Sequence, residues 1–255
     1  MQSSHTLKGV VFDLGWTLIH FDGVWDDVLE ESNQALAAYL QQQGFPIEYD
    51  ALLDKYGERK LESYRKRSKD NIERTTASVV REVMAAFGHN NLADELVKGA
   101  VEAFYQVSEV KWEPMPRVHE VLERIKAAGL KVGMISNAGD TSNVHRLISN
   151  AGIDASLFDP LIVSAAVGIR KPAPAIFQMV LDEWDLDPKE TVMIGDMLGA
   201  DIIGAQRTGM HTIWVTLDAD HKENHQYKHT VSPEFSVTHL YEIMAILSHL
   251  HGKPL

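Results

Sequence analysis

The chain contains no cysteine among its 255 residues. Disulfide bonds, thiolate metal sites and cysteine nucleophiles are therefore excluded. Long apolar runs are missing as well. No stretch reaches the roughly 18 apolar residues that cross a bilayer, and the beginning, MQSSHTLKG, lacks the apolar segment of a signal peptide. We therefore expect a soluble, cytoplasmic protein with no membrane partner.

Positive charge is also scarce. The chain has 24 Lys and Arg residues against 36 Asp and Glu residues, which gives a net charge of -12. Nucleic acids and anionic membranes are bound by basic surfaces, so we expect neither as a partner. An anionic small molecule would need local cations or a metal ion. The oligomeric state stays open between a monomer and a homodimer.

Helix and strand patterns alternate in the second half of the sequence. Apolar residues at helical spacing predict helices over 116–128, 141–151, 172–184 and 200–208. Short apolar runs predict strands over 130–136, 157–163, 191–195 and 211–215, in addition to a first strand that ends at Asp13. Such alternation is typical of parallel sheets with helices on both faces. We predict an α/β fold with a Rossmann-like parallel-sheet core.

Residues 25 to about 110 differ from this pattern, because they show helical periodicity and no convincing strand. One expected apolar face contains Leu36 and Leu40, and another contains Val79 and Val83. We predict an all-helical domain inserted after the first strand, with WEPMP (112–116) as the returning linker. The core would comprise residues 1–20 and 113–255, and the inserted domain residues 21–112.

Polar side chains stand at or after the ends of four predicted strands. They are Asp13, Ser136 with Asn137, Lys171, and Asp196 followed by Asp201. In open parallel sheets, ligands bind at the carboxyl ends of the strands. Crowded carboxylates repel unless a proton or cation lies between them, and Mg²⁺ binds carboxylates together with water and phosphate. The pattern predicts phosphoryl transfer, with Asp13 as nucleophile and with Ser136 and Lys171 holding phosphate oxygens.

Four segments carry a family resemblance. VFDLGWTLI, VGMISNAG, GIRKPAPAIF and VMIGDMLGADIIGAQRTGM resemble, in this order, the four motifs of the haloacid dehalogenase-like (HAD) superfamily. The helical insertion after the first motif resembles the cap of the subfamily with an α-helical cap. The resemblance covers essentially the whole chain, with the cap matched by position and helicity.

The resemblance implies a hydrolase that acts on a small phosphorylated metabolite through an aspartyl-phosphate intermediate. Asp13 would attack phosphorus, and water would later hydrolyse the acyl phosphate. Mg²⁺ would be held by the Asp13 carboxylate, the backbone carbonyl of Gly15 and Asp196, and Asp201 would support that site directly or through water. Ser136, Asn137 and Lys171 would bind the phosphoryl group, with Lys171 also counted as catalytic.

The chain departs from the family pattern at Gly15. Phosphatases of the family usually carry there an aspartate that protonates the leaving group, and they have a glycine where this chain has Trp16. The metal ligand survives, because it is a backbone carbonyl. A general acid–base group is lost, and such a group typically contributes about 10²- to 10⁴-fold to the rate.

Three interpretations of Gly15 stay open. The first is a phosphatase in which another group or water supplies the proton. The second is a different hydrolase, such as a 2-haloacid dehalogenase, although the acidic pattern of Asp196 and Asp201 argues against it. The third is a non-catalytic or weakly catalytic protein that binds a phosphorylated ligand or a partner. Because Asp13, Lys171 and Asp196 are intact, we favour the phosphatase.

Basic side chains of the cap offer a further possibility. Phosphonatases of the superfamily also have a small residue at the position of Gly15, but they form a Schiff base with a cap lysine. The candidates Lys55, Lys60, Lys66 and Lys69 lie in polar stretches where we expect solvent exposure, so none is nominated. The basic run Arg65–Arg67, with Arg74, is interpreted as a solvated helix face rather than an anion site.

Overall fold

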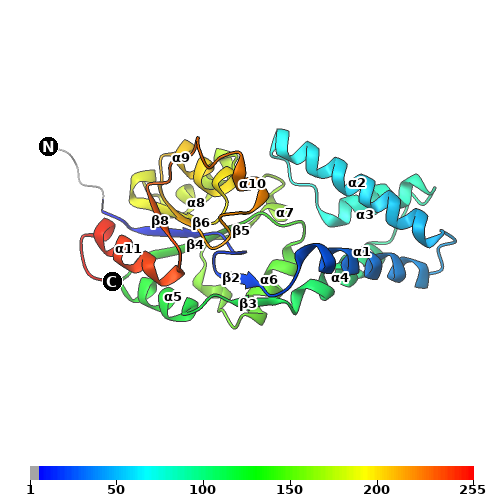
Figure 1. Cartoon of the computed structure of the whole chain (residues 1–255), viewed down its shortest axis with the longest axis horizontal. Helices are drawn as coiled ribbons and strands as arrows, with labels where there is room; N and C mark the ends of the chain where they lie inside the picture. The colour runs from blue at the N-terminus through cyan, green and yellow to red at the C-terminus, as the bar shows by residue number, and fades with distance from the viewer. Residues whose placement is uncertain (1–5) are drawn as a thin grey trace.

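A parallel sheet forms the centre of the computed structural model, which describes residues 6–255 (Figure 1). Residues 1–5 of the predicted core lie outside the described residues. Within residues 6–255 the sheet has six strands in the order β5-β4-β1-β6-β7-β8, and all neighbouring pairs are parallel. The strands are β1 (Gly9–Phe12), β4 (Lys131–Ser136), β5 (Leu161–Val163), β6 (Thr191–Gly195), β7 (His211–Val215) and β8 (Phe235–Val237). The predicted α/β fold is confirmed.

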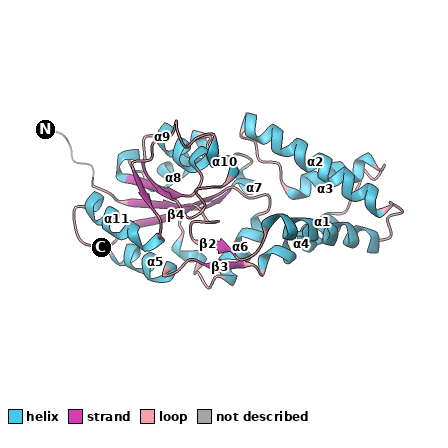
Figure 2. Cartoon of the chain, in the orientation of Figure 1, coloured by secondary structure: helices cyan, strands magenta, loops and turns pink. Residues whose placement is uncertain are grey.

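Helices cover both faces of this sheet (Figure 2). Val10 and Phe12 of β1 pack on one face with α5 (Val118–Ala127), α6 (Thr141–Asn150) and α11 (Ile243–His251). Val11 points to the opposite face, where it packs with α8 (Pro174–Trp184) and α9 (Ile203–Thr208). Successive strand residues point to opposite faces, so the unbroken apolar run of β1 is what a strand covered on both faces requires.

The cap is formed by α1 (Trp25–Gln42), α2 (Tyr49–Asp70), α3 (Thr76–Ala86) and α4 (Asp94–Glu109). It has a hydrophobic core of its own, which includes Leu40, Tyr56, Val83 and Phe104. In Figure 1 these helices lie at the end of the molecule away from the C-terminus. The chain therefore buries its inserted helices separately from the sheet, and the boundaries at residues 20/21 and 112/113 stay a prediction.

An antiparallel pair of strands stands where the chain leaves and re-enters the core. β2 (Ile19–Phe21) pairs with β3 (Trp112–Pro114). The predicted returning linker is thus partly a strand, and its partner lies far away in the sequence, where local patterns cannot reveal it. Edge-to-face ring contacts join Trp16, Phe21, Trp25 and Trp112 here, and we name these four residues the aromatic cluster.

Other differences from the predicted elements are local. The strand expected over 157–163 is restricted to Leu161–Val163, since Ala155–Leu157 form a 3-10 turn (η1) and Pro160 has no N–H to donate. The helix expected over 200–208 begins as a π-helical turn, η3 (Leu198–Ile202), and continues as α9. The sequence patterns assign neither α7 (Ser164–Val167) nor anything beyond residue 215, where the structure has α10 (Lys222–His225), β8 and α11. Across residues 6–255, no helix has the length and apolarity needed to span a membrane.

Candidate active site

Three carboxylates meet at the carboxyl edge of the sheet. Asp13 follows β1, Asp196 follows the adjacent β6, and Asp201 lies in η3. One oxygen from each carboxylate lies within 4.8 Å of the others. Asp13 is 9% exposed, whereas Asp196 and Asp201 are 2% and 0% exposed, so Asp13 is the one best placed to meet a ligand. The structure thus brings together the acidic residues that the sequence motifs single out.

Lys171 supplies the positive charge of this group. Its Nζ lies 2.5 Å from Asp13 Oδ1 and 2.7 Å from Asp201 Oδ1, and it donates a hydrogen bond to the carbonyl of Ile135 at 2.6 Å. Burial alone would lower the pKa of this ammonium, but the neighbouring Asp13 and Asp201 outweigh it and the pKa is raised. Lys171 is therefore a buried, permanently charged group next to the proposed nucleophile.

The carboxylates outnumber this one ammonium. Burial raises the pKa of Asp13 to about 6, against the attraction of Lys171. Burial also raises the pKa of Asp196 well above its ordinary value, and repulsion from Asp13 and Asp201 adds to the effect. Without a further cation, the site holds its negative charges at a cost in free energy.

Asp201 provides a test of whether a divalent cation fits. Its Oδ2 accepts a hydrogen bond from the Met197 N–H at 2.9 Å. Its buried Oδ1 lies 2.7 Å from the ammonium of Lys171. Three clustered carboxylates that share the ammonium of Lys171 are a donor set that suits Mg²⁺. Residue 195 has to be glycine, because a Cβ there would lie 2.3 Å from Asp201 Oδ2.

Ser136 and Asn137 stand at the end of β4, which neighbours β1. The side-chain amide of Asn137 donates to the Lys171 carbonyl at 3.0 Å, and its Oδ1 accepts from the Lys171 N–H at 2.9 Å. Asn137 therefore holds the backbone that carries Lys171. The substrate-binding roles of Ser136 and Asn137 stay predictions.

Gly15 lies against the aromatic cluster. A Cβ at this position would stand 3.4 Å from Cη2 of Trp112. The next residue, Trp16, has a φ of 56°, a left-handed conformation that non-glycine residues rarely adopt, and its ring meets that of Trp112 edge to face at 6.1 Å. Trp16 therefore packs against Trp112, the residue nearest to the position that a Cβ at residue 15 would occupy.

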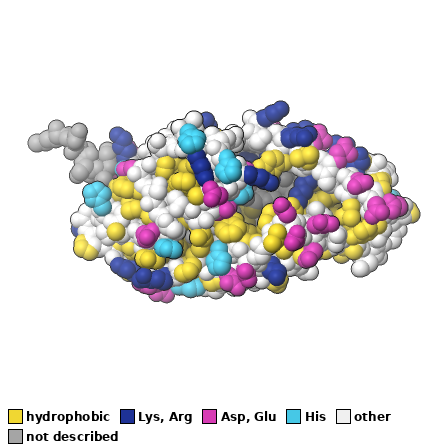
Figure 3. Space-filling model, viewed as in Figure 1, with side chains coloured by type: hydrophobic (Ala, Val, Ile, Leu, Met, Phe, Trp, Pro, Cys, Tyr) yellow, Lys and Arg dark blue, Asp and Glu magenta, His cyan; other side chains and the backbone are white. Residues whose placement is uncertain are grey.

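The cap closes over the site. A cleft of about 430 Å³ is lined by Lys171 and Asn137 of the core and by Tyr64 and Arg67 of α2. Figure 3 shows the surface hollowed between the two parts of the chain, with Lys and Arg side chains around the hollow. Backbone hydrogen bonds join the α2–α3 loop to core loops: Glu73 N to Gly168 O, Arg170 N to Asn71 O and Thr76 N to Gly139 O, all at 2.9–3.0 Å. Tyr64 of the cap also donates its hydroxyl to Glu223 of α10.

Two cap residues differ from the predicted solvated face. The Nζ of Lys60 is buried, as is the Nε of Arg67, and both side chains line a cavity inside the cap. Arg65, Lys66 and Lys69 are exposed as predicted. The signal that sequence reasoning missed is spacing: Leu52, Tyr56, Lys60, Ser63 and Arg67 recur every three or four residues and so share one helix face.

Comparison with known proteins supports a relationship along most of the chain. The family profile of haloacid dehalogenase-like hydrolases matches residues 7–209. The chain is 28% identical to the glyceraldehyde 3-phosphate phosphatase of Pyrococcus furiosus over 144 residues, which are 54% of this chain and 59% of that protein. It is 24% identical to the phosphatase of the same name from Methanocaldococcus jannaschii over 247 residues, which are 96% of this chain and 98% of that protein. A 2-haloacid dehalogenase structure from Pseudomonas syringae superimposes with a TM-score of 0.65 at 25% identity, covering 95% of this chain and 99% of that one.

Proposed function

The chain belongs to the haloacid dehalogenase-like hydrolase family, and we propose that it is a phosphatase that hydrolyses a small phosphomonoester through a phosphoryl group carried on Asp13. The observation that carries this proposal is the position of Asp13. It is a partly accessible carboxylate that contacts Lys171 and shares a cluster with Asp196 and Asp201. The phosphatase names of the relatives agree with it.

The chain's own residues account for two displacement steps. In the first step an Asp13 oxygen attacks phosphorus, the bond from phosphorus to the ester oxygen breaks, and the departing alcohol takes one proton. In the second step water attacks the same phosphorus, the bond to Asp13 breaks, and inorganic phosphate leaves while one proton returns to solvent. Lys171, 2.5 Å from Asp13, would offset the charge on the phosphoryl oxygens, and Ser136 and Asn137 would orient them.

A Mg²⁺ ion fits the acidic cluster, where Asp13, Asp196, Asp201 and the carbonyl of Gly15 would hold it. When bound, the ion would neutralise the crowded carboxylates and polarise the phosphoryl oxygens. The cluster of three carboxylates beside the Lys171 ammonium supports this assignment.

Gly15 leaves the departing alcohol without a side-chain acid at the usual position. The nearest side chain to a Cβ at this position is the ring of Trp112, which carries no acidic group. We therefore expect the rate to depend strongly on the leaving group, with aryl phosphates favoured over simple alkyl phosphates unless the substrate provides its own proton.

The test is phosphate release with and without Mg²⁺ from p-nitrophenyl phosphate and from a panel of alkyl phosphates. Asp13→Asn should abolish turnover, whereas the matched change Asp22→Asn, at an exposed residue, should not. Absence of phosphate release from every ester, with or without the metal, would contradict the proposal.

A 2-haloacid dehalogenase is the second candidate, because Gly15 is compatible with halide, which leaves without a proton. The similarity to the Pseudomonas syringae enzyme favours it. Chloride release from 2-chloropropionate in the presence of a chelator would support this function, and phosphate release that requires Mg²⁺ would support the first. Lack of both activities would favour a non-catalytic protein that binds a phosphorylated ligand or a partner.

A further inference from the structure

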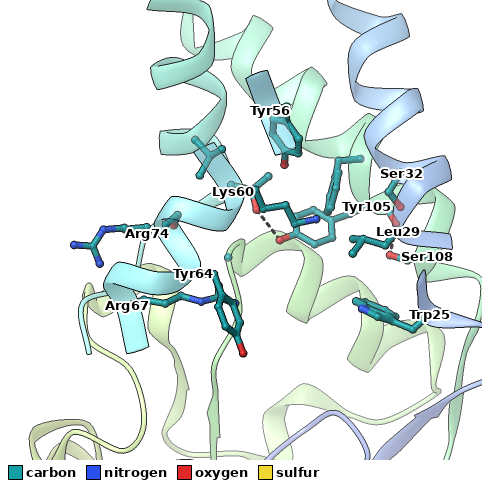
Figure 4. A pocket seen from close by; sticks show the side chains of 15 residues that line it. Trp25, Leu29, Ser32, Tyr56, Lys60, Tyr64, Arg67, Arg74, Tyr105 and Ser108 are labelled. Carbon is teal, nitrogen blue, oxygen red and sulfur yellow. Dashed lines mark hydrogen bonds between the residues drawn. The ribbon is translucent and has the colours of Figure 1, made fainter. Parts of the chain in front are cut away.

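The cap contains a cavity of about 220 Å³ that the proposed chemistry does not use. Its wall includes the rings of Trp25, Tyr56, Phe104 and Tyr105 from three different cap helices, together with hydroxyl groups and basic side chains. Figure 4 shows Lys60 among these rings, with Arg67 and Tyr64 on the same helix nearer to the core. The cavity therefore combines aromatic rings with basic side chains and hydroxyl groups.

Lys60 has no anionic partner in this enclosure. Its Nζ is buried and lacks a hydrogen-bond partner among residues 6–255, and it lies 5.1 Å from the ring centroid of Phe104 and 6.0 Å from that of Tyr56. Burial, followed by repulsion from Arg67, lowers the pKa of Lys60 to about 8. The ammonium form still predominates at neutral pH, and a buried charge without a partner is costly unless a ligand supplies one.

The neighbouring ion pairs do not neutralise this charge. Arg67 and Arg170 both face a single buried carboxylate, that of Glu73, at 3.9 Å and 3.7 Å. Glu73 also accepts a hydrogen bond from Ser164 at 2.7 Å. Glu73 thus carries one negative charge between two arginines, and no ion pair among residues 6–255 neutralises Lys60.

The cavity adjoins the cleft that is lined by Lys171, which contacts Asp13. Tyr64 and Arg67 line both spaces, and the second space also contains Lys171. A molecule with its phosphoryl group beside Asp13 and Lys171 would therefore extend past Arg67 toward Lys60.

We propose that this cavity binds a carboxylate at the far end of the substrate, so that the substrate is a phosphomonoester whose organic part ends in a carboxylate. The proposal rests on the phosphatase function above. A carboxylate suits the cavity because its oxygens could pair with the unpartnered Lys60 ammonium, and the rings of Tyr56 and Phe104 beside that ammonium would accommodate a short carbon chain. Lys60 would donate to the carboxylate, with Arg67 beside it.

The experiment compares two esters that differ at the far end only. 3-Phosphoglycerate ends in a carboxylate, and glycerol 3-phosphate ends in a hydroxymethyl group. The wild-type kcat/KM should be higher for the carboxylate. We call the kcat/KM for 3-phosphoglycerate divided by that for glycerol 3-phosphate the ratio. Lys60→Met should lower this ratio by about 10- to 100-fold, mainly through the KM for 3-phosphoglycerate, as expected for a lost charge-assisted hydrogen bond. Lys66→Met on the same helix, where Lys66 is exposed and paired with Glu62 at 2.7 Å, should leave the ratio unchanged.

Turnover of p-nitrophenyl phosphate separates failure of this proposal from failure of the phosphatase assignment. If that ester is hydrolysed but the ratio in Lys60→Met stays within about twofold of wild type, the carboxylate site is refuted. Preference for 1,3-propanediol bisphosphate over 3-phosphoglycerate would also refute it, in favour of a second phosphate. If no ester is hydrolysed, binding of 3-phosphoglycerate is measured by calorimetry in wild type and in Lys60→Met, and equal affinities overturn the proposal.

Discussion

Replacing Lys171 by methionine tests the electrostatics of the candidate active site. The ammonium of Lys171 is 2% exposed and contacts Asp13, Asp201 and the Ile135 carbonyl at 2.5–2.7 Å. Methionine has a similar volume but no charge, so three carboxylates would be left together without a cation. Removing one partner of a buried ion pair typically costs about 3–5 kcal/mol. We expect a loss of that size in the free energy of unfolding near neutral pH without metal.

The loss should depend on pH in a defined direction. Because burial raises the pKa of Asp13 to about 6, and that of Asp196 is raised as well, protonation stabilises the folded state below these values. The stabilising effect of proton uptake is present at low pH and is lost as the pH rises through the folded-state pKa. The deficit of Lys171→Met should therefore shrink between about pH 7.5 and pH 5, and Mg²⁺ should reduce it at the higher pH.

The assay is urea unfolding followed by circular dichroism at both pH values, with and without Mg²⁺. Lys131→Met, the same change at an exposed position of β4, serves as the control. A deficit below about 1 kcal/mol, or one that is equal at both pH values, would refute the electrostatic argument.

Three further predictions follow from the same geometry. Saturating Mg²⁺ should raise the melting temperature near neutral pH and raise it less near pH 5, because burial raises the pKa of Asp13 to about 6 and protons then compete with the ion. In the same calorimetric measurement, Asp196→Asn should diminish the increase in melting temperature that Mg²⁺ causes. Gly15→Ala should change the free energy of unfolding by less than about 1 kcal/mol, because its Cβ would meet Trp112 at 3.4 Å, an ordinary van der Waals distance. Gly195→Ala should cost about 1–3 kcal/mol in thermal unfolding, because its Cβ would lie 2.3 Å from Asp201 Oδ2. If Lys60 binds a carboxylate, the KM for 3-phosphoglycerate should rise above about pH 8, since the pKa of the free ammonium is about 8, and the KM for glycerol 3-phosphate should show no such additional rise.

The acidic cluster illustrates how far sequence reasoning reaches. Asp13 and Asp196 directly follow the buried strands β1 and β6, and Lys171 comes after β5 and α7. Parallel strands of one sheet present their carboxyl ends at one edge. Their meeting was therefore predictable from local patterns plus one rule of topology. The pairing of β2 with β3 was not, because it joins segments on either side of the cap, and neither segment by itself carries a strong strand pattern.

The cap shows the opposite case. Lys60 and Arg67 stand in a charged helix, and composition alone predicts solvent there. Only the packing of α2 against Phe104 of α4 decides that the Lys60 ammonium lies above an aromatic ring. Helical spacing identifies which residues share a face, but not what that face meets.

The sequence by itself therefore determined the α/β architecture, the helical insertion and the residues at the strand ends, because these depend on local periodicity and on the parallel arrangement of strands. The tertiary structure alone decided which basic side chains lack acidic partners, how the aromatic cluster contacts Gly15 and which cap residues line the cleft. These features depend on contacts between segments distant in the chain, and burial, which sets the energy of a charge, is a property of the folded molecule as a whole.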